Sequence, residues 1–208
     1  MSSPFDQSRY QVRFEWGIEG LERVAPADVV VVVDVLRFST TVAARVADGE
    51  SVPLDAAALA VSRNGAVVAG RAGDALVLLG CVRNAAAVAQ AVLRHQHDRG
   101  ARTSVAVIAA GERDGSDGRV RFAVEDQLGA GAVIDALAAL GIDHTSPEAA
   151  AAGEAFRGLR PALRHLLTAS GSGQELIELG RRDEVLAASV LDDVAAVPVL
   201  RDGVFEAF

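Results

Sequence analysis

The stretch that most restricts the fold is VVVVVDVLRFSTTV, residues 29–42. Its five consecutive valines predict a strand buried on both faces, because a strand with one face in water would alternate apolar and polar residues. The strand ends at Asp34, and a buried carboxylate loses hydration free energy unless a cation or a donor pairs with it. The stretch therefore predicts a buried strand and a following helix with a charged junction between them.

The rest of the chain repeats this alternation of strand and helix. Further strands are predicted at QVRFEW, AVVAG, DALVLLG, SVAVIAAG and VAAVPVL, and helices at STTVAARVADG, RNAAAVAQAVLRHQHDRG and VEDQLGAGAVIDALAALG. Residues 147–182 have a wholly helical pattern, and GERDGSDGRVRF at residues 111–122 is predicted to be a long loop. We expect an α/β fold, a three-layer sandwich with a mostly parallel or mixed sheet, in one domain spanning residues 1–208.

Charge and composition exclude several classes of function. The formal net charge is −8, so the chain lacks the basic face that a nucleic-acid backbone requires. It contains no lysine, which excludes Schiff-base chemistry and a P-loop and leaves arginine, hydroxyls and backbone N–H groups to bind anions.

Location is predicted from the apolar runs and the cysteine. The apolar runs are shorter than the roughly 18 to 20 residues of a membrane span, and the N-terminus lacks a signal-peptide core. The single cysteine, Cys81, is expected to be a small buried residue, as suits a reducing compartment. A cytoplasmic protein without membrane or nucleic-acid partners is expected.

Polar residues follow the first long strand at the edge where α/β sheets bind ligands. Asp34 has either Arg37 or a metal ion as its expected partner. Ser39 and Thr40 lie where a helix starts, so a hydroxyl there is either an N-cap or, with free N–H groups, part of an anion site. An ordinary cap with an Asp34–Arg37 pair and a ligand site are both compatible with the stretch.

Two later strand ends carry further candidates. Arg83 and Asn84 open a helix: Asn84 is a good N-cap, whereas a cation at that position opposes the helix dipole unless water or a bound anion compensates it. Glu125 and Asp126 open another helix, where acids suit the dipole but also supply oxygen ligands for Mg²⁺. Glu112 could join them, and Asp192 precedes the last strand.

Four motifs in chain order resemble the 2-phosphosulfolactate phosphatase family. They are VVVVVDVLRFSTTV, GCVRNAAAVA, VAVIAAGE followed by VEDQLGAGAVIDAL, and SGSGQELIELGRRDEVLAASVLDDVAAVPVL. The resemblance covers most of the chain. It implies the ComB-like fold, a homodimer, and Mg²⁺-dependent removal of phosphate from 2-phospho-3-sulfolactate on the route to coenzyme M.

The resemblance also implies roles for individual residues. Asp34, Glu125 and Asp126 would form the acidic metal and catalytic cluster with Arg37 as a further catalytic residue, and Asp192 would be an additional metal ligand. Ser39, Thr40, Arg83 and Asn84 would bind the substrate, a small anionic phospho-metabolite.

One segment departs from the family pattern. Between the second strand unit and GCVRNA, family members carry a stretch that resembles a Ser-Pro-rich turn and then an Asn-Gly loop ahead of the next helix. Here the segment near residues 65–80 is shortened, and GAVVAGRAGDALVLLGC is predicted to pass straight from one strand to the next. The pair Asn64-Gly65 is interpreted as an ordinary turn. A pocket wall is then missing or rebuilt, so the alternative to a phosphatase is a member that binds a small anionic metabolite without turnover.

Overall fold

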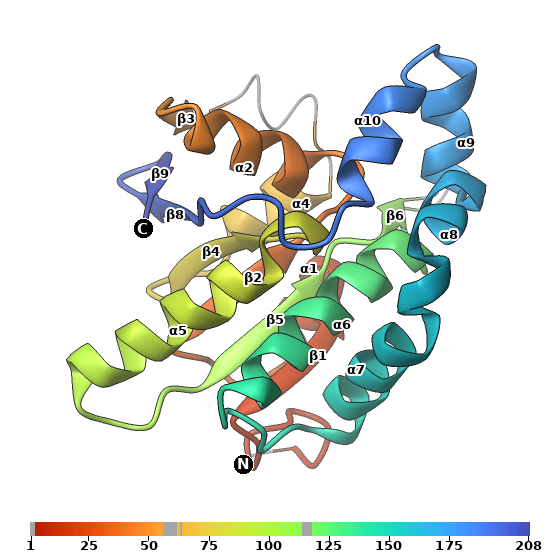
Figure 1. Cartoon of the computed structure of the whole chain (residues 1–208). Coiled ribbons are helices and arrows are strands. Elements are labelled where there is room, and N and C mark those ends of the chain that lie inside the picture. Colours follow the sequence, from red (N-terminus) through yellow and green to blue (C-terminus); the bar gives the residue numbers. More distant parts are fainter. Residues whose placement is uncertain (1–2, 56–61, 63, 114–117) are drawn as a thin grey trace.

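The computed structural model describes residues 3–55, 62, 64–113 and 118–208. Within these residues one seven-stranded mixed sheet has the order β1-β5-β2-β4-β8-β9-β3 (Figure 1). The first four of these strands are parallel: β1 (Val12–Trp16), β5 (Val105–Ala109), β2 (Val29–Val33) and β4 (Leu76–Gly80). The last three are antiparallel: β8 (Pro198–Arg201), β9 (Val204–Ala207) and β3 (Val52–Pro53).

The valine run of β2 shows why the fold has three layers. Val29, Val31 and Val33 belong to the apolar core beneath α5 (Ala85–Arg99), α6 (Val124–Ala139) and α7 (Pro147–Leu159). Val30 and Val32 point to the other face, into the core beneath α1 (Gly17–Arg23), α2 (Phe38–Ala47) and α4 (Gly65–Ala69). Because successive side chains of a strand alternate in direction, a continuous valine run requires a helical layer on each face.

The remaining helices continue along the edge of the α6–α7 layer. They are α8 (Leu163–Ala169), α9 (Gly171–Glu178) and α10 (Arg182–Ala188), and short 3₁₀ turns lie at Val82–Asn84 and Arg160–Ala162. Figure 1 shows that α9 and α10 lie side by side and that α10 is the nearer of the two to the end of α2. The predicted three-layer sandwich and the helical character of residues 147–182 are confirmed.

Two local predictions were wrong. AVVAG is a helical turn, α4, because a five-residue apolar run fits a buried helix and a buried strand equally well. Part of the expected long loop at residues 111–122 is a small hairpin of β6 (Glu112–Arg113) and β7 (Val120–Arg121), and residues 114–117 lie outside the described residues. The elements α1, β3 and β9 were not predicted.

Two glycines of α6 allow this helix to pack closely against the sheet and against α7. A Cβ atom at Gly129 would lie 2.5 Å from a methyl carbon of Val35, and one at Gly131 would lie 2.3 Å from the carbonyl oxygen of Ala152. Any larger side chain at either position would push the helix away. The close approach places the first turn of α6 over the carboxyl end of β2.

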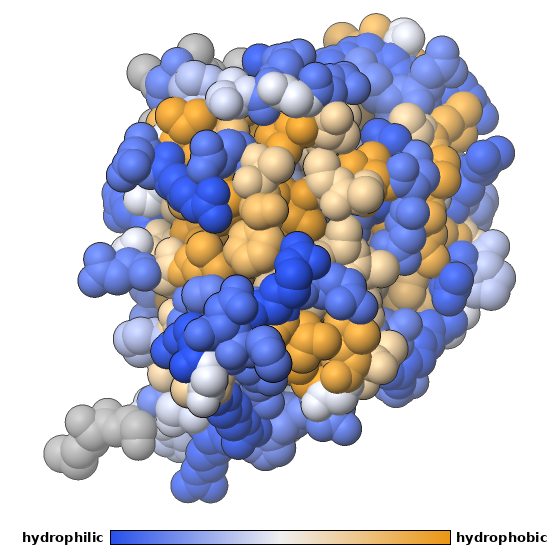
Figure 2. Space-filling view, turned by 60° about the vertical axis from the view of Figure 1, so that its left-hand side comes forward, coloured by the Kyte–Doolittle hydropathy of each residue, from blue (hydrophilic) through white to orange (hydrophobic). Residues whose placement is uncertain are grey.

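One side of the surface is shown in Figure 2, where hydrophobic residues form patches bordered by hydrophilic residues. The large hydrophobic side chains most exposed in the described chain are Phe5, Leu179 and Phe122. None of the described helices combines the length and the apolar character of a membrane span.

Candidate functional site

A cavity of about 620 Å³ opens at the carboxyl ends of β2 and β5, between α2 and α9. Its acidic wall comes from residues that directly follow these strands and from the first turn of α6. Its apolar wall includes Phe38 and Val42 of α2 and Leu176 of α9. This is the edge of an open α/β sheet at which ligands generally bind.

Asp34 is at the centre of the acidic wall and is 8% exposed. Its carboxylate accepts hydrogen bonds from the backbone N–H of Phe38 at 3.3 Å, from the N–H of Gly65 at 3.1 Å and from the hydroxyl of Ser62 at 3.3 Å. These donors fix the side chain between the start of α2 and the start of α4. Among the described residues the partners of Asp34 are therefore backbone amides and a hydroxyl and not Arg37. Of the two partners left open by the sequence, the Asp34–Arg37 pair is wrong.

Asp126 connects two strand ends and is 3% exposed. Its Oδ1 accepts the N–H of Val35 at 2.7 Å, and its Oδ2 accepts the N–H of Gly111 at 2.9 Å. Val35 follows β2 and Gly111 follows β5. The side chain therefore holds the two loops that form the acidic wall in a fixed relation.

Two further acids complete the wall. Glu125, which is also 3% exposed, accepts a hydrogen bond from the Ser172 hydroxyl at the start of α9. Glu112 accepts a 3.3 Å hydrogen bond from the amide nitrogen of Asn64. The amide oxygen of Asn64 is buried and makes no hydrogen bond within the described residues, so it is an unused oxygen beside the carboxylates.

The acidic residues repel one another electrostatically. Burial raises the pKa of Asp34, and proximity to Glu112 adds to the increase. Burial raises the pKa of Asp126 well above its ordinary value, and the charges of Asp34 and Glu125 raise it further. A cation among these oxygens would relieve both effects.

The donor set suits a hard divalent ion, since it consists of carboxylate and amide oxygens. In the part of the chain that the structure describes, no three His, Cys, Asp or Glu side chains are grouped closely enough to form a metal cage. Mg²⁺ commonly uses one or two carboxylates, several waters and a substrate phosphate, so a complete protein cage is not required. Asp34, Glu125 and Asp126 all line the cavity and are therefore the candidate ligands.

Three arginines line the same cavity: Arg37 precedes α2, Arg45 lies in its last turn and Arg181 lies between α9 and α10. Arg45 pairs with Glu50 and Arg181 with Glu184. Arg37 has no ion pair among the described residues and is available to an anion.

Comparison with known proteins identifies the family of the chain. A family model described as 2-phosphosulpholactate phosphatase matches residues 54–203, which include all of the acidic wall except Asp34. The chain belongs to the 2-phosphosulfolactate phosphatase family. A relative in Symbiobacterium thermophilum, named "Probable 2-phosphosulfolactate phosphatase", is 32% identical over 135 residues, which are 64% of this chain and 52% of that protein. The chain thus spans about half the length of this curated relative.

The phosphatase-family residues predicted from the sequence divide into two groups. Asp34, Arg37, Glu125 and Asp126 come together in the cavity. Ser39 and Thr40 do not line it: Ser39 is fully buried, accepts the N–H of Asp34 and donates to the carbonyl of Val32. Thr41 lines the cavity instead, because it lies one helical turn beyond Arg37 on the same face of α2.

Arg83 and Asn84 lie outside the cavity and have structural partners. Arg83 forms a two-bond ion pair with Asp193, at 2.8 and 2.7 Å, so the anion that compensates this cation is part of the protein. Asn84 holds the N-cap position of α5, but its side chain instead bonds to the N–H of Cys81 and to the carbonyls of Leu79 and Ala196. Cys81 is fully buried, as predicted.

Asp192 is also placed away from the proposed metal ligands. Its Oδ1 accepts the N–H of Ala86 at 2.8 Å, so it caps α5 from a loop more than a hundred residues later in the chain. It does not line the cavity. The pairing of a distant loop with a helix start had no local sequence signal.

Ser62, Asn64 and Gly65 were missed as site residues. The pair Asn64-Gly65 is the start of α4 and not a turn before a strand, and it contributes an amide and an N–H to the acidic wall. The pocket wall that was expected to be missing or rebuilt thus includes Ser62 and Asn64. An Asn-Gly pair predicts a turn from local preference alone, and only its approach to Asp34 shows the other role.

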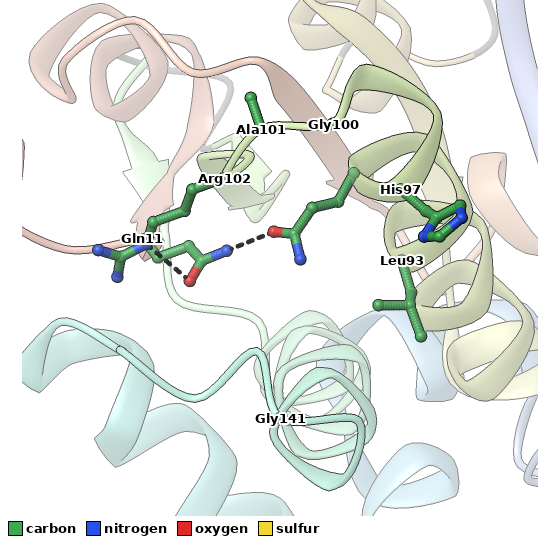
Figure 3. Close-up of a pocket in the computed structure, with 8 residues that line it drawn as sticks. Gln11, Leu93, His97, Gly100, Ala101, Arg102 and Gly141 are labelled. Atoms are coloured by element: carbon green, nitrogen blue, oxygen red, sulfur yellow. Dashed lines mark hydrogen bonds between the residues drawn. The ribbon is translucent and has the colours of Figure 1, made fainter.

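A second pocket, of about 550 Å³, lies at the opposite edge of the sheet near Gly100 and Gly141, where α5 and α6 end (Figure 3). Its polar side chains bond to one another: Gln11 donates to Gln96 at 2.8 Å, and Arg102 donates to Gln11 at 3.0 Å. The C-terminal ends of helices carry partial negative charge. This pocket is therefore a poorer anion site than the cavity at the strand ends.

Proposed function

We propose that this chain is a Mg²⁺-dependent phosphatase of a small anionic 2-phospho acid, namely 2-phosphosulfolactate or a related metabolite. The observation that carries the proposal is that one cavity is lined by the buried acids Asp34, Glu125 and Asp126 and by Arg37, which has no ion pair among the described residues. Family membership supports the same reaction. A phosphomonoester needs both a bound cation for its oxygens and donors for the charge that grows in the transition state.

Mg²⁺ would be held by Asp34 with Glu125 or Asp126, and the amide oxygen of Asn64 is a further donor. When bound, the ion would neutralise phosphate oxygens and orient the leaving group.

The side chains of the protein have distinct roles in this proposal. Asp126 keeps the loops after β2 and β5 in place through Val35 and Gly111. Arg37 contributes planar donors that match two phosphate oxygens. The apolar wall of α2 and α9 excludes water around the substrate, which strengthens these electrostatic contacts.

Binding without turnover is the competing function. Both oxygens of Asp126 accept backbone N–H bonds, and Asp34 accepts three hydrogen bonds, so the two acids also have a structural role independent of a metal. In that case the chain would hold a small anionic metabolite and leave its phosphate intact.

Release of phosphate distinguishes the two functions. We would incubate 2-phosphosulfolactate and a panel of other 2-phospho acids with wild type and Asp34→Asn, in Mg²⁺ and in EDTA. Asp192→Asn is the matched control, because this residue lies outside the cavity. Release that requires both Mg²⁺ and Asp34 supports the phosphatase. If folded wild type releases no phosphate from any compound of the panel, the phosphatase function is wrong and binding without turnover is favoured.

Family resemblance also leads us to propose a homodimer in the cytoplasm. The single cysteine is buried and unpaired, which suits a reducing compartment. Light scattering on the purified chain tests the dimer, and cell fractionation tests the location.

A further inference from the structure

The three buried acids of the cavity differ in the hydrogen bonds that their carboxylates accept. Asp34 accepts three, and each oxygen of Asp126 accepts a backbone N–H. Among the described residues, Glu125 accepts one, which the Ser172 hydroxyl donates to Oε1. Oε2 of Glu125 is thus the one oxygen of these carboxylates that accepts no hydrogen bond from a described residue, although the residue is only 3% exposed.

The backbone that carries Ser172 is held at the start of α9. The hydroxyl of Ser170 accepts the N–H of Gly173 at 3.0 Å and donates to the carbonyl of Leu167 at 2.9 Å, so it joins the end of α8 to the first turn of α9. A Cβ atom at Gly173 would clash with that same carbonyl oxygen. This close packing leaves the first turn of α9 little freedom, so the position of the Ser172 hydroxyl is restricted.

The backbone that carries Glu125 is restricted in the same way. Glu125 is the second residue of α6, and the close approach of Gly129 to Val35 holds the start of this helix against the end of β2. With both helix starts held in place, the hydrogen bond from Ser172 limits the rotamers that the Glu125 side chain can adopt.

We infer that Ser172 is a positioning residue, whose hydroxyl binds Oε1 of Glu125 and leaves Oε2 free to bind the divalent cation of the proposed function. The inference rests on the proposed function and adds a residue that acts through Glu125. Carboxylates that bind metals are themselves held by hydrogen bonds, and loss of such a partner commonly weakens metal affinity tenfold or more. A hydroxyl that only offsets the burial of Glu125 would change stability and leave the affinity for the cation unaltered.

Calorimetry of the metal-free full chain, with Mg²⁺ as the only ligand, tests the inference without turnover. In Ser172→Ala the Kd for Mg²⁺ should rise about tenfold. Ser172→Thr keeps a hydroxyl on the same Cβ atom, so its Kd should stay within about threefold of wild type. In the phosphate-release assay, Ser172→Ala should need about tenfold more Mg²⁺ for half-maximal activity, with kcat at saturating Mg²⁺ little changed.

Ser189→Ala is the matched control, because the Ser189 hydroxyl donates to the carbonyl of Leu186 and Ser189 does not line the cavity. It should leave the Kd for Mg²⁺ unchanged. A double-mutant cycle with Glu125→Gln tests whether Ser172 acts through Glu125. In the Glu125→Gln background, Ser172→Ala should have almost no further effect on this Kd.

The inference and the proposed function fail in different ways. An equal Kd in Ser172→Ala and wild type, an equal rise in Ser172→Thr or Ser189→Ala, or a wild type that binds no Mg²⁺ would overturn the inference. If wild type binds Mg²⁺ but releases no phosphate from any 2-phospho acid, the phosphatase function is wrong. The effect of Ser172→Ala on the Kd for Mg²⁺ then still decides the role of Ser172.

Discussion

The backbone N–H of Gly65 donates to Oδ2 of Asp34 at 3.1 Å, and a Cβ atom at position 65 would lie 2.7 Å from that same oxygen. The contact is thus available only to glycine. It joins the start of α4 to the carboxyl end of β2, and it brings a segment whose pattern resembles a simple turn into the acidic wall.

We expect Gly65→Ala to displace Asp34 and reduce phosphate release at least tenfold. The added methyl group also lies 2.9 Å from a ring carbon of Phe38, so overpacking should lower the free energy of unfolding by about 1 to 3 kcal/mol. Urea unfolding and the release assay measure the two effects. Gly70→Ala is the control, since its nearest new contact is at 3.5 Å, and an equal loss there would argue against a special role for position 65.

The contribution of Asp34 and Asp126 to the stability of the metal-free protein should fall as the pH rises above 3.8. The pKa values of Asp34 and Asp126 are raised by burial, so the folded state retains protons that the unfolded state has lost. Their stabilising effect is complete below 3.8, the unfolded value, and disappears as pH passes upward through the raised folded values. Urea unfolding in EDTA as a function of pH should show a weaker downward trend in Asp126→Asn. An identical trend in both proteins would contradict the raised pKa.

Mg²⁺ should raise the thermal midpoint of wild type, because an ion bound only to the folded state stabilises it by mass action. Asp34→Asn should abolish this shift. Asp192→Asn should retain it, since Asp192 caps α5 and an asparagine oxygen can accept the same hydrogen bond. A shift lost in Asp192→Asn but kept in Asp34→Asn would reverse the assignment of the metal site.

Asp193→Asn should reduce stability and leave activity unchanged. Its carboxylate forms a partly exposed two-bond ion pair with Arg83 outside the cavity, so the expected loss in the free energy of unfolding is about 1 kcal/mol. Arg83→Gln should cost a similar amount, and the double variant should cost less than the sum of the two. A selective rise in KM in Arg83→Gln would instead restore Arg83 as a substrate-binding residue.

Much of the fold follows from short-range patterns in the sequence. The valine run requires burial on both faces, and a strand buried on both faces requires two helical layers, so the three-layer sandwich was predictable before any contact was known. The same reasoning placed Asp34 at a strand end, and the acids that open α6 were recognised because carboxylates in a first turn are an identifiable local signal. These features depend on periodicity and order along the chain.

The partners of those residues depend on the packed molecule. Asp34 bonds to Gly65 rather than to Arg37, Asp192 caps a helix that begins more than a hundred residues earlier, and Arg83 has an internal anion. Each of these contacts joins segments far apart in the chain, and its free energy comes from burial and from polar groups left without water. Local conformational preference contains no information about burial or about access to water. The sequence alone therefore identified the chemical groups of the site, whereas their contacts are determined by the folded arrangement.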